Sequence, residues 1–365
     1  MIRLATIALL GRADTPTDAV EEYCAYLSEA LRAQGIRLTI ERVPWEEGGW
    51  GRALQALRER AKTWKGLWVI VQYTALAWSS RGFPLRFSRV LEILKGAGVR
   101  VAVVYHDVEP FAGTRIIDRL RRHAQLRAMR RAIDVCDIAV FTVPMEKLSW
   151  MQTRSTHSVF IPVGANLPVS REAAYRKTIA SGGKLNIGVF SVTGGSATLK
   201  EIGEIVGAVR FASSHVKNLK LTVLGRNSKE SESEFLKQLD GAPVEIQVLG
   251  LLSNKDVART LFSCDVLLFV RGPISTRRGS AIAGIACGLP VIAAEGSETS
   301  PLITEAGVAF YSPQKKNDLG TVLLHVLQDE HYRASLAQRS WIAQQRYFSW
   351  TAIASRYAQF LEKRS

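Results

Sequence analysis

Short apolar runs alternate with longer amphipathic stretches along almost the whole chain. The apolar runs are rich in Val, Ile and Leu and predict buried strands. In the first half of the chain they fall at residues 4–10, 37–42, 66–73, 99–105, 138–141 and 159–161. The second half repeats the pattern at residues 185–190, 219–224, 244–249, 266–270, 290–294 and 308–311. The stretches between them have the spacing typical of helices, for example at residues 18–34, 51–63 and 85–97.

Strands that alternate with helices predict a fold of the α/β class, in which helices cover both faces of a parallel sheet. Two successive series predict two doubly wound, Rossmann-like domains that face a cleft. We expect the first domain to span residues 1–170 and the second residues 171–340, followed by a C-terminal helix over residues 341–365. The junction lies between residues 164 and 183, where Pro168, a charged run and Ser181-Gly182-Gly183 interrupt the pattern.

The composition is that of a globular protein, with 47% hydrophobic and 22% charged residues among 365. No apolar run approaches the ~18 residues needed to span a bilayer. The first ten residues, MIRLATIALL, imitate the apolar part of a signal peptide, but Gly11 and Arg12 follow at once and favour a buried strand. Four cysteines without a CxxC pair predict free thiols in a reduced compartment; they are Cys24, Cys136, Cys264 and Cys287. We therefore expect a cytoplasmic protein.

The formal net charge of +15 is spread over both halves and implies an acidic partner. One helical stretch holds a cluster of arginines: Arg115, Arg119, Arg121, Arg122, Arg127, Arg130 and Arg131. Its apolar positions can line one face, so that the arginines cover the rest; they are Ile116, Ile117, Leu120, Leu126 and Met129. Two interpretations stay open, a solvated helix face and a surface for anionic lipid headgroups on the inner face of a membrane. Because no nucleic-acid module appears, we do not expect nucleic acid as the partner.

The stretch FVRGPISTRRGSAIAGIACGLPVIA (residues 269–293) predicts a strand, a loop and a helix followed by another strand. Unpaired N–H groups and the dipole at the start of a helix favour an anion such as a phosphate or diphosphate. Gly279 and Ser280 stand at that helix start, and Arg277 and Arg278 add bidentate donors. The alternative for the two arginines is an ordinary solvated surface.

Polar residues also follow the first predicted strand. Gly11 would let a ligand approach the backbone closely, and Arg12 follows it. Asp18 either caps the next helix or accepts a hydrogen bond from a substrate hydroxyl. This loop has no G-x-G-x-x-G motif, which argues against simple dinucleotide binding.

His106 follows the strand at residues 99–105 and stands next to Asp107 and near Glu109. Carboxylates can orient a histidine and tune it for catalysis; a structural histidine is the alternative. No other His or Cys has ligand-like spacing nearby, so we expect no metal site.

Two loops of the second half complete the candidate set. The first runs from Ser191 through Gly194 and Gly195 to Lys200 and is rich in hydroxyl groups, so it suits an oxyanion; a plain flexible loop is equally open. The second, around Leu252, is a loop whose backbone could hold a nucleotide base.

Taken together, these motifs resemble glycosyltransferases of the GT-B type, and glycosyltransferase family 4 in particular. The resemblance rests on the order and spacing of VFIPVG (159–164), VEIQVLGLLSNKDVARTLFSCDVLLFV (244–270), IACGLPVIA (285–293) and FSWTAIASRY (348–357). It implies an N-terminal acceptor domain, a C-terminal nucleotide-sugar domain and a last helix that crosses back to the first domain. It also implies metal-independent transfer with retention, with no cofactor apart from the nucleotide diphosphate sugar as co-substrate.

The chain departs from the family at its donor residues. Two family glutamates align with Ser275 and Ala283, and the family's arginine after the first strand of the second domain aligns with Ser191. The resemblance implies that Lys200 keeps the family's lysine role and that the two adjacent arginines replace the missing diphosphate cation. His106 aligns with the cleft histidine of the family.

The leading hypothesis is therefore a glycosyltransferase of polysaccharide biosynthesis that moves a sugar from a nucleotide-sugar donor to a glycan or lipid-linked acceptor. We expect His106 and Asp107 to be catalytic and the acceptor to meet Gly11, Arg12 and Asp18. The expected donor residues are Ser191, Lys200, Leu252, Ser275, Arg277, Arg278, Gly279 and Ser280. Two other classes stay open: a nucleotide-sugar epimerase on the same fold, and a non-catalytic partner subunit that binds a sugar or nucleotide.

Overall fold

The computed structural model describes residues 2–151, 157–169 and 183–363. The chain forms two compact units: unit 1 comprises Met1–Pro162 and Trp350–Ser365, and unit 2 comprises Val163–Ser349. The chain thus passes into unit 2 after Pro162, whereas the expected boundary at residues 170 and 171 lies outside the described residues.

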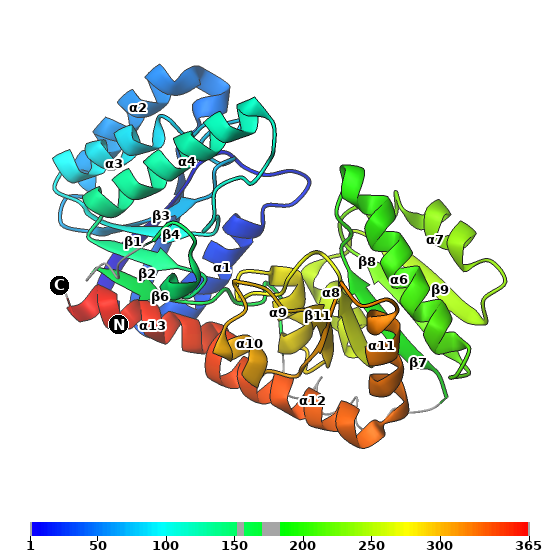
Figure 1. Ribbon diagram of the computed structural model, residues 1–365. Helices are drawn as coiled ribbons and strands as arrows, with labels where there is room; N and C mark the ends of the chain where they lie inside the picture. The colour runs from blue at the N-terminus through cyan, green and yellow to red at the C-terminus, as the bar shows by residue number, and fades with distance from the viewer. Residues whose placement is uncertain (1, 152–156, 170–182, 364–365) are drawn as a thin grey trace. The chain divides into compact units, whose positions relative to one another are not determined.

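Unit 1 is built on a sheet of six parallel strands in the order β2-β1-β3-β4-β5-β6 (Figure 1). The strands are β1 (Leu4–Leu10), β2 (Ile36–Arg42), β3 (Trp68–Tyr73), β4 (Arg100–Tyr105), β5 (Ile138–Phe141) and β6 (Ser158–Phe160). They lie where the apolar runs predict them. Every residue of β3 is buried, because a central parallel strand is covered by helices on both faces.

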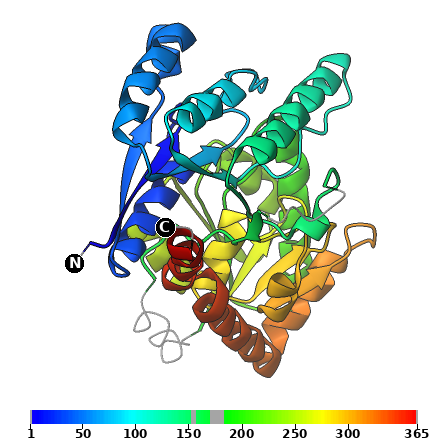
Figure 2. The same cartoon turned by 90° about the vertical axis from the view of Figure 1, so that its left-hand side faces the viewer.

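Helices cover both faces of the first sheet. On one face α2 (Trp45–Thr63), α3 (Phe87–Gly96) and α4 (Ile116–Val135) lie side by side (Figure 2). On the other face α1 (Ala19–Arg32) packs against α13 (Trp350–Lys363). A short 3-10 turn, η1 (Met145–Lys147), follows β5.

The last helix is held to unit 1 by aromatic and hydrogen-bonding contacts. The hydroxyl groups of Tyr23 and Tyr357 lie 3.0 Å apart, and Trp68 Nε1 donates to Leu361 O at 3.2 Å. The expected single helix over residues 341–365 is divided in the structure. The preceding helix, α12 (Glu330–Ala343), ends in a π-helical turn, η3 (Gln344–Phe348), before α13 begins.

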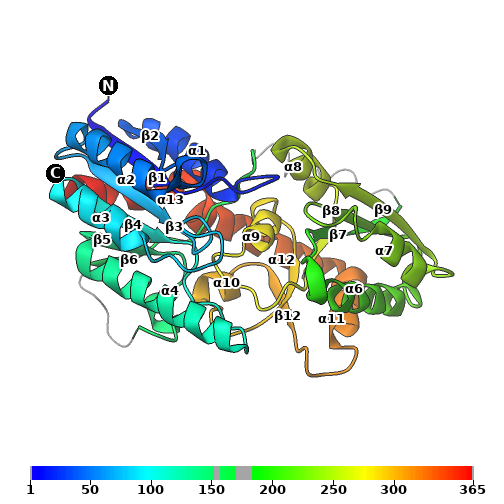
Figure 3. The ribbon, with the colours of Figure 1, turned by 90° about the horizontal axis from the view of Figure 1, so that it is seen from above.

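Unit 2 contains a second parallel sheet, in the order β12-β11-β10-β7-β8-β9. Its strands also match the predicted runs: β7 (Leu185–Phe190), β8 (Leu219–Leu224), β9 (Val244–Gly250), β10 (Val266–Phe269), β11 (Val291–Ala294) and β12 (Val308–Tyr311). Helix α6 (Thr198–Ser213) packs against α11 (Asp318–Gln328), and α9 (Gly279–Ala286) packs against α12 (Figure 3). The remaining elements are η2 (Gly195–Ala197), α7 (Glu232–Leu239), α8 (Asn254–Phe262) and α10 (Pro301–Glu305).

Two further expectations concern the chain as a whole. The four cysteines are free and buried, as predicted. Among the described helices, none is both long and apolar enough to cross a membrane.

Candidate functional site

The strand order of unit 2 places β7 directly beside β10, although β8 and β9 lie between them in the sequence. The chain therefore builds the sheet outward from β7 in one direction and from β10 in the other. We call the carboxyl ends of these two neighbouring strands the switch point. In doubly wound sheets, ligands bind at such a point.

Backbone hydrogen bonds join the loops on the β7 side of the switch point. Val192 N donates to Arg226 O at 3.0 Å, and Gly225 N donates to Gly250 O at 2.7 Å. Ser191 adopts a left-handed backbone conformation with φ 69°, and its Oγ accepts from Arg226 N at 3.3 Å. The predicted donor residue Ser191 is therefore fixed between two strand-end loops at this edge of the sheet.

On the β10 side, the guanidinium of Arg277 is neutralised by Glu298. Arg277 Nε lies 2.7 Å from Glu298 Oε2 and Arg277 Nη2 lies 2.8 Å from Oε1. Their side chains are only 20% and 16% exposed. Burial would raise the pKa of Glu298, but the hydrogen bonds and charge of Arg277 hold it below its ordinary value. Arg277 thus has a carboxylate partner, which the expected role as a diphosphate cation did not include.

Sequence reasoning missed Glu298. It lies just beyond the carboxyl end of β11, so the rule that binding residues follow strands could have found it. Its pairing with a residue 21 positions earlier in the chain had no sequence signal.

The hydrogen bonding of Arg278 differs from that of Arg277. Its Nε is buried and has no hydrogen-bond partner among the described residues. Burial lowers the pKa of its guanidinium, and the cations of Arg277 and Arg271 lower it further, while Glu298 opposes this. The structure therefore leaves a partly buried cation at the N-cap of α9, where an anion would be stabilised.

The first turn of α9 contains the predicted donor residues Gly279 and Ser280. Their N–H groups have no acceptor within the helix, because the first residues of any helix lack one. Ser275 and Ala283, which replace the glutamates of the resembled family, are both buried, Ser275 in the loop before α9 and Ala283 within it. The structure thus brings Arg278 and two backbone donors together at one helix end.

Arg271, which the sequence analysis did not select, lies two residues beyond β10. Its Nε donates to Thr193 Oγ1, in the loop after β7, at 3.3 Å. This contact joins the two loops of the switch point. Its signal in the sequence was its position directly after a buried strand.

Two other predicted donor residues are exposed to different degrees. The Lys200 side chain is 82% exposed and lies 3.8 Å from Glu204 on the next turn of α6. It lines a pocket of about 610 Å³ in unit 2 together with Gly272 and Pro273. Leu252 is half-buried in the loop between β9 and α8.

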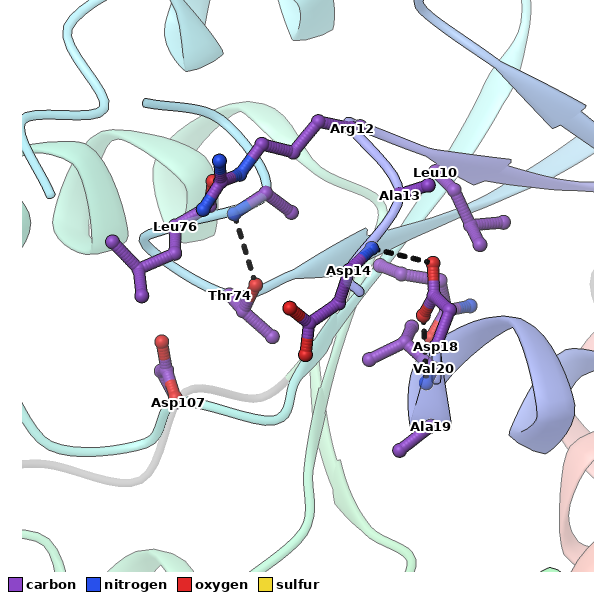
Figure 4. Close-up of a pocket in the computed structure, with 13 residues that line it drawn as sticks. Leu10, Arg12, Ala13, Asp14, Asp18, Ala19, Val20, Thr74, Leu76 and Asp107 are labelled. Carbon is purple, nitrogen blue, oxygen red and sulfur yellow. Dashed lines mark hydrogen bonds between the residues drawn. The ribbon is translucent and has the colours of Figure 1, made fainter. Parts of the chain in front are cut away.

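Unit 1 has a pocket of its own, of about 240 Å³, at the carboxyl ends of β1, β3 and β4 (Figure 4). The structure brings four predicted residues together around it: Gly11, Arg12, Asp18 and Asp107. It adds three that the prediction missed: Asp14, Gln72 and Thr74. In Figure 4 the carboxylates of Asp14 and Asp107 and the hydroxyl of Thr74 face the same space. Their oxygen atoms suit a ligand that presents hydroxyl groups.

The structure adds a second reason for Gly11. A Cβ atom at Gly11 would overlap the carbonyl oxygen of Ala77, so the chain's own backbone requires a glycine at this position; the approach of a ligand stays a prediction. The same carbonyl accepts from Arg12 N at 2.9 Å. The Arg12 guanidinium donates to Leu76 O at 2.7 Å and lies 3.1 Å from Glu46.

Asp18 is the N-cap of α1, which was one of its two open roles. Its Oδ1 accepts from Val20 N and Glu21 N, and its Oδ2 lies 2.7 Å from Arg42 Nη2. Burial would raise its pKa, but the hydrogen bonds from Glu21 and Arg42 lower it below the ordinary value. Asp18 therefore lines the pocket as an ionised carboxylate whose oxygens already accept several bonds.

His106 is oriented differently from the sequence-based expectation. Its Nε2 lies 2.8 Å from Gln72 Oε1, which can only accept, and its ring meets Tyr23 edge-on at 5.1 Å. The neighbouring carboxylates bind elsewhere: Asp107 accepts from Ala75 N at 2.7 Å and Glu109 from Ser149 N at 2.6 Å.

Burial lowers the pKa of His106 to about 4, and the negative charge of Asp18 opposes this only in part. The imidazole is therefore neutral at pH 7. Because Gln72 lines the pocket, His106 acts on the pocket through one hydrogen bond. Among the described residues, no group of three or more His, Cys, Asp or Glu side chains is arranged to hold a metal ion.

The first turns of α4 expose apolar side chains. Ile116 is 80% exposed, Leu120 58% and Ile117 47%. Met129 is buried, and Leu126 packs partly against the core, so the single apolar face predicted for these five positions is wrong.

Two buried polar residues explain which side of α4 faces the core. Asp118 accepts from Arg121 Nη1 at 2.7 Å, and Gln125 accepts from Phe111 N at 2.7 Å while donating to Gly82 O at 3.0 Å. These bonds hold Asp118 and Gln125 on the inner side of the helix. The opposite side is exposed, and we call it the α4 surface: Ile116, Arg119, Leu120, His123, Arg127 and Arg130, with Phe111 in the preceding loop.

Comparison with known proteins addresses the fold. No family model and no curated protein matches the chain. Sucrose-phosphate synthase from Thermosynechococcus elongatus is similar with a TM-score of 0.69 and 16% identity over 99% of both chains. HepE of Anabaena, in complex with UDP and glucose, has a TM-score of 0.66 and 14% identity over 98% of this chain and 99% of its own. The chain has the two-domain, Rossmann-like GT-B fold.

A UDP-N-acetylglucosamine 2-epimerase structure from Listeria monocytogenes has a TM-score of 0.62 and 11% identity over 100% of this chain and 98% of its own. The GT-B fold is thus found in proteins described by different reactions. The fold alone does not select between these reactions, because function depends on the residues of the site.

Proposed function

We propose that the chain is a glycosyltransferase that moves a sugar from a nucleoside diphosphate sugar to a glycan or lipid-linked acceptor, with retention and without a metal ion. The observation that carries this proposal is Arg278, a partly buried guanidinium whose Nε has no partner among the described residues. Negative charge develops on the diphosphate as the bond to the sugar breaks, and fixed cations and N–H groups stabilise it. Arg278 and the first turn of α9 supply both kinds of group.

In this proposal the pocket of unit 1 receives the acceptor. Asp14, Asp107 and Thr74 present oxygen atoms that can accept from acceptor hydroxyl groups. The hydrogen bond from His106 fixes the side-chain oxygen of Gln72, and Gln72 Nε2 donates to Ile70 O at 3.4 Å, so this buried side chain is held at both ends. Asp107 is thus the group that faces the acceptor, and His106 is a positioning residue behind it.

The likeness to proteins that bind UDP guides the choice of the first probe. The chain would be incubated with UDP-glucose, with and without a panel of alkyl glycosides as acceptors, and release of UDP would be measured. Release that requires an acceptor, together with a glycosylated product, supports transfer. Other sugar nucleotides, based on GDP and ADP, would be tested in the same way.

The same assay separates the two other classes. An epimerase would convert UDP-N-acetylglucosamine to its 2-epimer in the absence of any acceptor. The epimerase-like fold of the Listeria protein gives a reason to include this substrate. A non-catalytic partner subunit would give no turnover, and failure of calorimetry to detect binding of UDP, GDP or ADP would support that alternative.

We also propose that the α4 surface places the protein on an anionic membrane, where a lipid-linked acceptor would lie. The surface combines exposed apolar side chains with arginines on one side of a helix, as expected for a helix that lies in a membrane interface. Exposed apolar residues weaken the alternative of a simply solvated helix, since burial of Ile116 and Leu120 in lipid would remove them from water.

A further inference from the structure

The position of Arg271 sets it apart from the other arginines of unit 2. It follows β10 at the switch point, and its Nε reaches Thr193 Oγ1 across to the loop that follows β7. Thr193 itself is held in place, because its N–H donates to the buried Glu201 at 2.8 Å. The guanidinium of Arg271 is thus fixed between the two loops where ligands of such sheets bind.

Arg271 and Arg278 form a pair of neighbouring cations. A Cβ atom on Gly272, the residue next to Arg271, would lie 3.8 Å from Arg278 Nη2. Burial lowers the pKa of Arg271; Glu201 opposes this and Arg226 adds to it. Among the described residues, no carboxylate forms an ion pair with Arg271 or Arg278, whereas Arg277 has Glu298.

Two partly buried guanidinium groups that form no ion pair destabilise a protein, because the lost hydration is not replaced. An anion that bridges them would offset that cost. The planar donor fork of arginine matches phosphoryl oxygens in two-point contacts, and a diphosphate offers two adjacent groups, one for each arginine.

We propose that Arg271 is the second diphosphate-binding cation of the donor site and acts opposite Arg278 across the switch point. The loop after β7 has Ser191 where the resembled family carries arginine, and Arg271 brings a guanidinium to that loop from the neighbouring strand. The inference rests on the proposed function, since it deepens the donor site of that reaction. The ligand is the diphosphate of a nucleoside diphosphate or its sugar ester.

The test compares Arg271→Ala, Arg271→Lys and a matched control, Arg259→Ala. Arg259 lies on α8 of the same unit with an 80% exposed side chain. Calorimetry would use UDP, GDP and ADP, each beside its nucleoside, and inorganic pyrophosphate. We expect Arg271→Ala to weaken binding of the preferred nucleoside diphosphate about 10- to 100-fold, with the nucleoside unaffected. Arg271→Lys should give an intermediate loss, and Arg259→Ala none.

Melting of the ligand-free protein separates binding from a structural role. Removal of an uncompensated cation should leave the Tm of Arg271→Ala unchanged or higher. If Arg271 only holds the loop through Thr193, the Tm would fall and the nucleoside would bind more weakly as well, which overturns the inference.

The outcomes also separate this inference from the proposed function. Equal diphosphate affinity of wild type and Arg271→Ala overturns the inference and leaves the proposed function standing. Binding of pyrophosphate that depends on Arg271, without binding of any nucleoside diphosphate, supports the anion site but removes the proposed donor. A wild-type chain that binds none of these probes overturns both.

Discussion

Both carboxylate oxygens of Glu298 accept from the guanidinium of Arg277, Oε2 from Nε at 2.7 Å and Oε1 from Nη2 at 2.8 Å. This pair separates the roles of two arginines that are adjacent in the sequence. Arg277 is compensated by this pair, while the Nε of Arg278 is left without a partner among the described residues. The pair therefore anchors the loop before α9, and Arg278 is the cation that an incoming anion would meet.

Substitution of Arg278 by alanine should impair the proposed reaction without harming the fold. We expect a loss of about 100- to 1,000-fold in kcat, the size seen when one preorganised donor to a developing charge is removed. The Tm should not fall, because the guanidinium forms no ion pair among the described residues and is repelled by the cations of Arg277 and Arg271. Steady-state kinetics with the identified donor, beside Arg259→Ala, provide the measurement; full activity of Arg278→Ala would remove the diphosphate argument.

Substitution of Glu298 by glutamine should instead lower stability. It removes the negative charge that Glu298 places against the largely buried Arg277, at a cost of about 2 kcal/mol. For a unit of this size that cost corresponds to a decrease of roughly 4–8 °C in Tm. The matched control is Glu232→Gln, whose partner Lys229 is 62% exposed, and whose loss should cost well under 1 kcal/mol. Equal Tm values for the two variants would contradict the structural role of Glu298.

His106 should make the stability of unit 1 depend on pH. Its pKa is about 4 in the folded protein and about 6.5 when unfolded. Above pH 6.5 it is neutral in both states. As the pH falls from 6.5 toward 4, only the unfolded state takes up the proton, so stability decreases by up to about 3 kcal/mol.

This dependence can be checked with His106→Gln, which does not titrate. The Tm of the wild type should fall more steeply between pH 7 and pH 5 than the Tm of the variant. His215→Gln, at an exposed position on the other unit, serves as the control and should follow the wild type. Parallel curves for wild type and His106→Gln would show that His106 is not held neutral by burial.

The fold could be predicted because parallel strands buried on both faces have a simple sequence signal. The runs at β3 and β4, for example, are almost wholly apolar and nearly fully buried, and helices with a separate periodicity lie between them. The side of α4 that faces the core could not be predicted, because it carries Asp118 and Gln125. Their burial depends on partners as distant as Gly82, and a hydrophobic pattern contains no information about such bonds.

The candidate site, like the fold, could be predicted from the sequence only in part. The rule that ligands bind at strand ends selected Arg278, Asp107 and Asp18, which lie at such positions in the structure. It gave no means to distinguish Arg277 from Arg278, because their difference arises from Glu298 on another strand-end loop. The sequence shows that Arg271 follows a strand, but it does not show the contact with Thr193. These two residues are 78 positions apart and meet only because β7 and β10 are neighbours in the sheet.

The α4 surface should bind anionic membranes through both charge and apolar side chains. We expect the protein to sediment with phosphatidylcholine vesicles that contain phosphatidylglycerol, and less so as salt rises, because screening weakens the attraction of the arginines. Ile116→Ser and Leu120→Ser should each weaken binding about 10-fold at low salt, through lost apolar burial. Arg127→Ser should instead reduce the dependence of binding on salt.

Controls for this experiment lie on unit 2. Leu236 is 51% exposed on α7 and Arg259 is exposed on α8, so Leu236→Ser and Arg259→Ser alter the same kinds of side chain elsewhere. Both controls should bind vesicles as the wild type does. If they weaken binding equally, the attraction comes from the general positive charge of +15. If the wild type does not bind at all, the α4 surface is an ordinary solvated helix face, and its exposed isoleucines and leucine need another explanation.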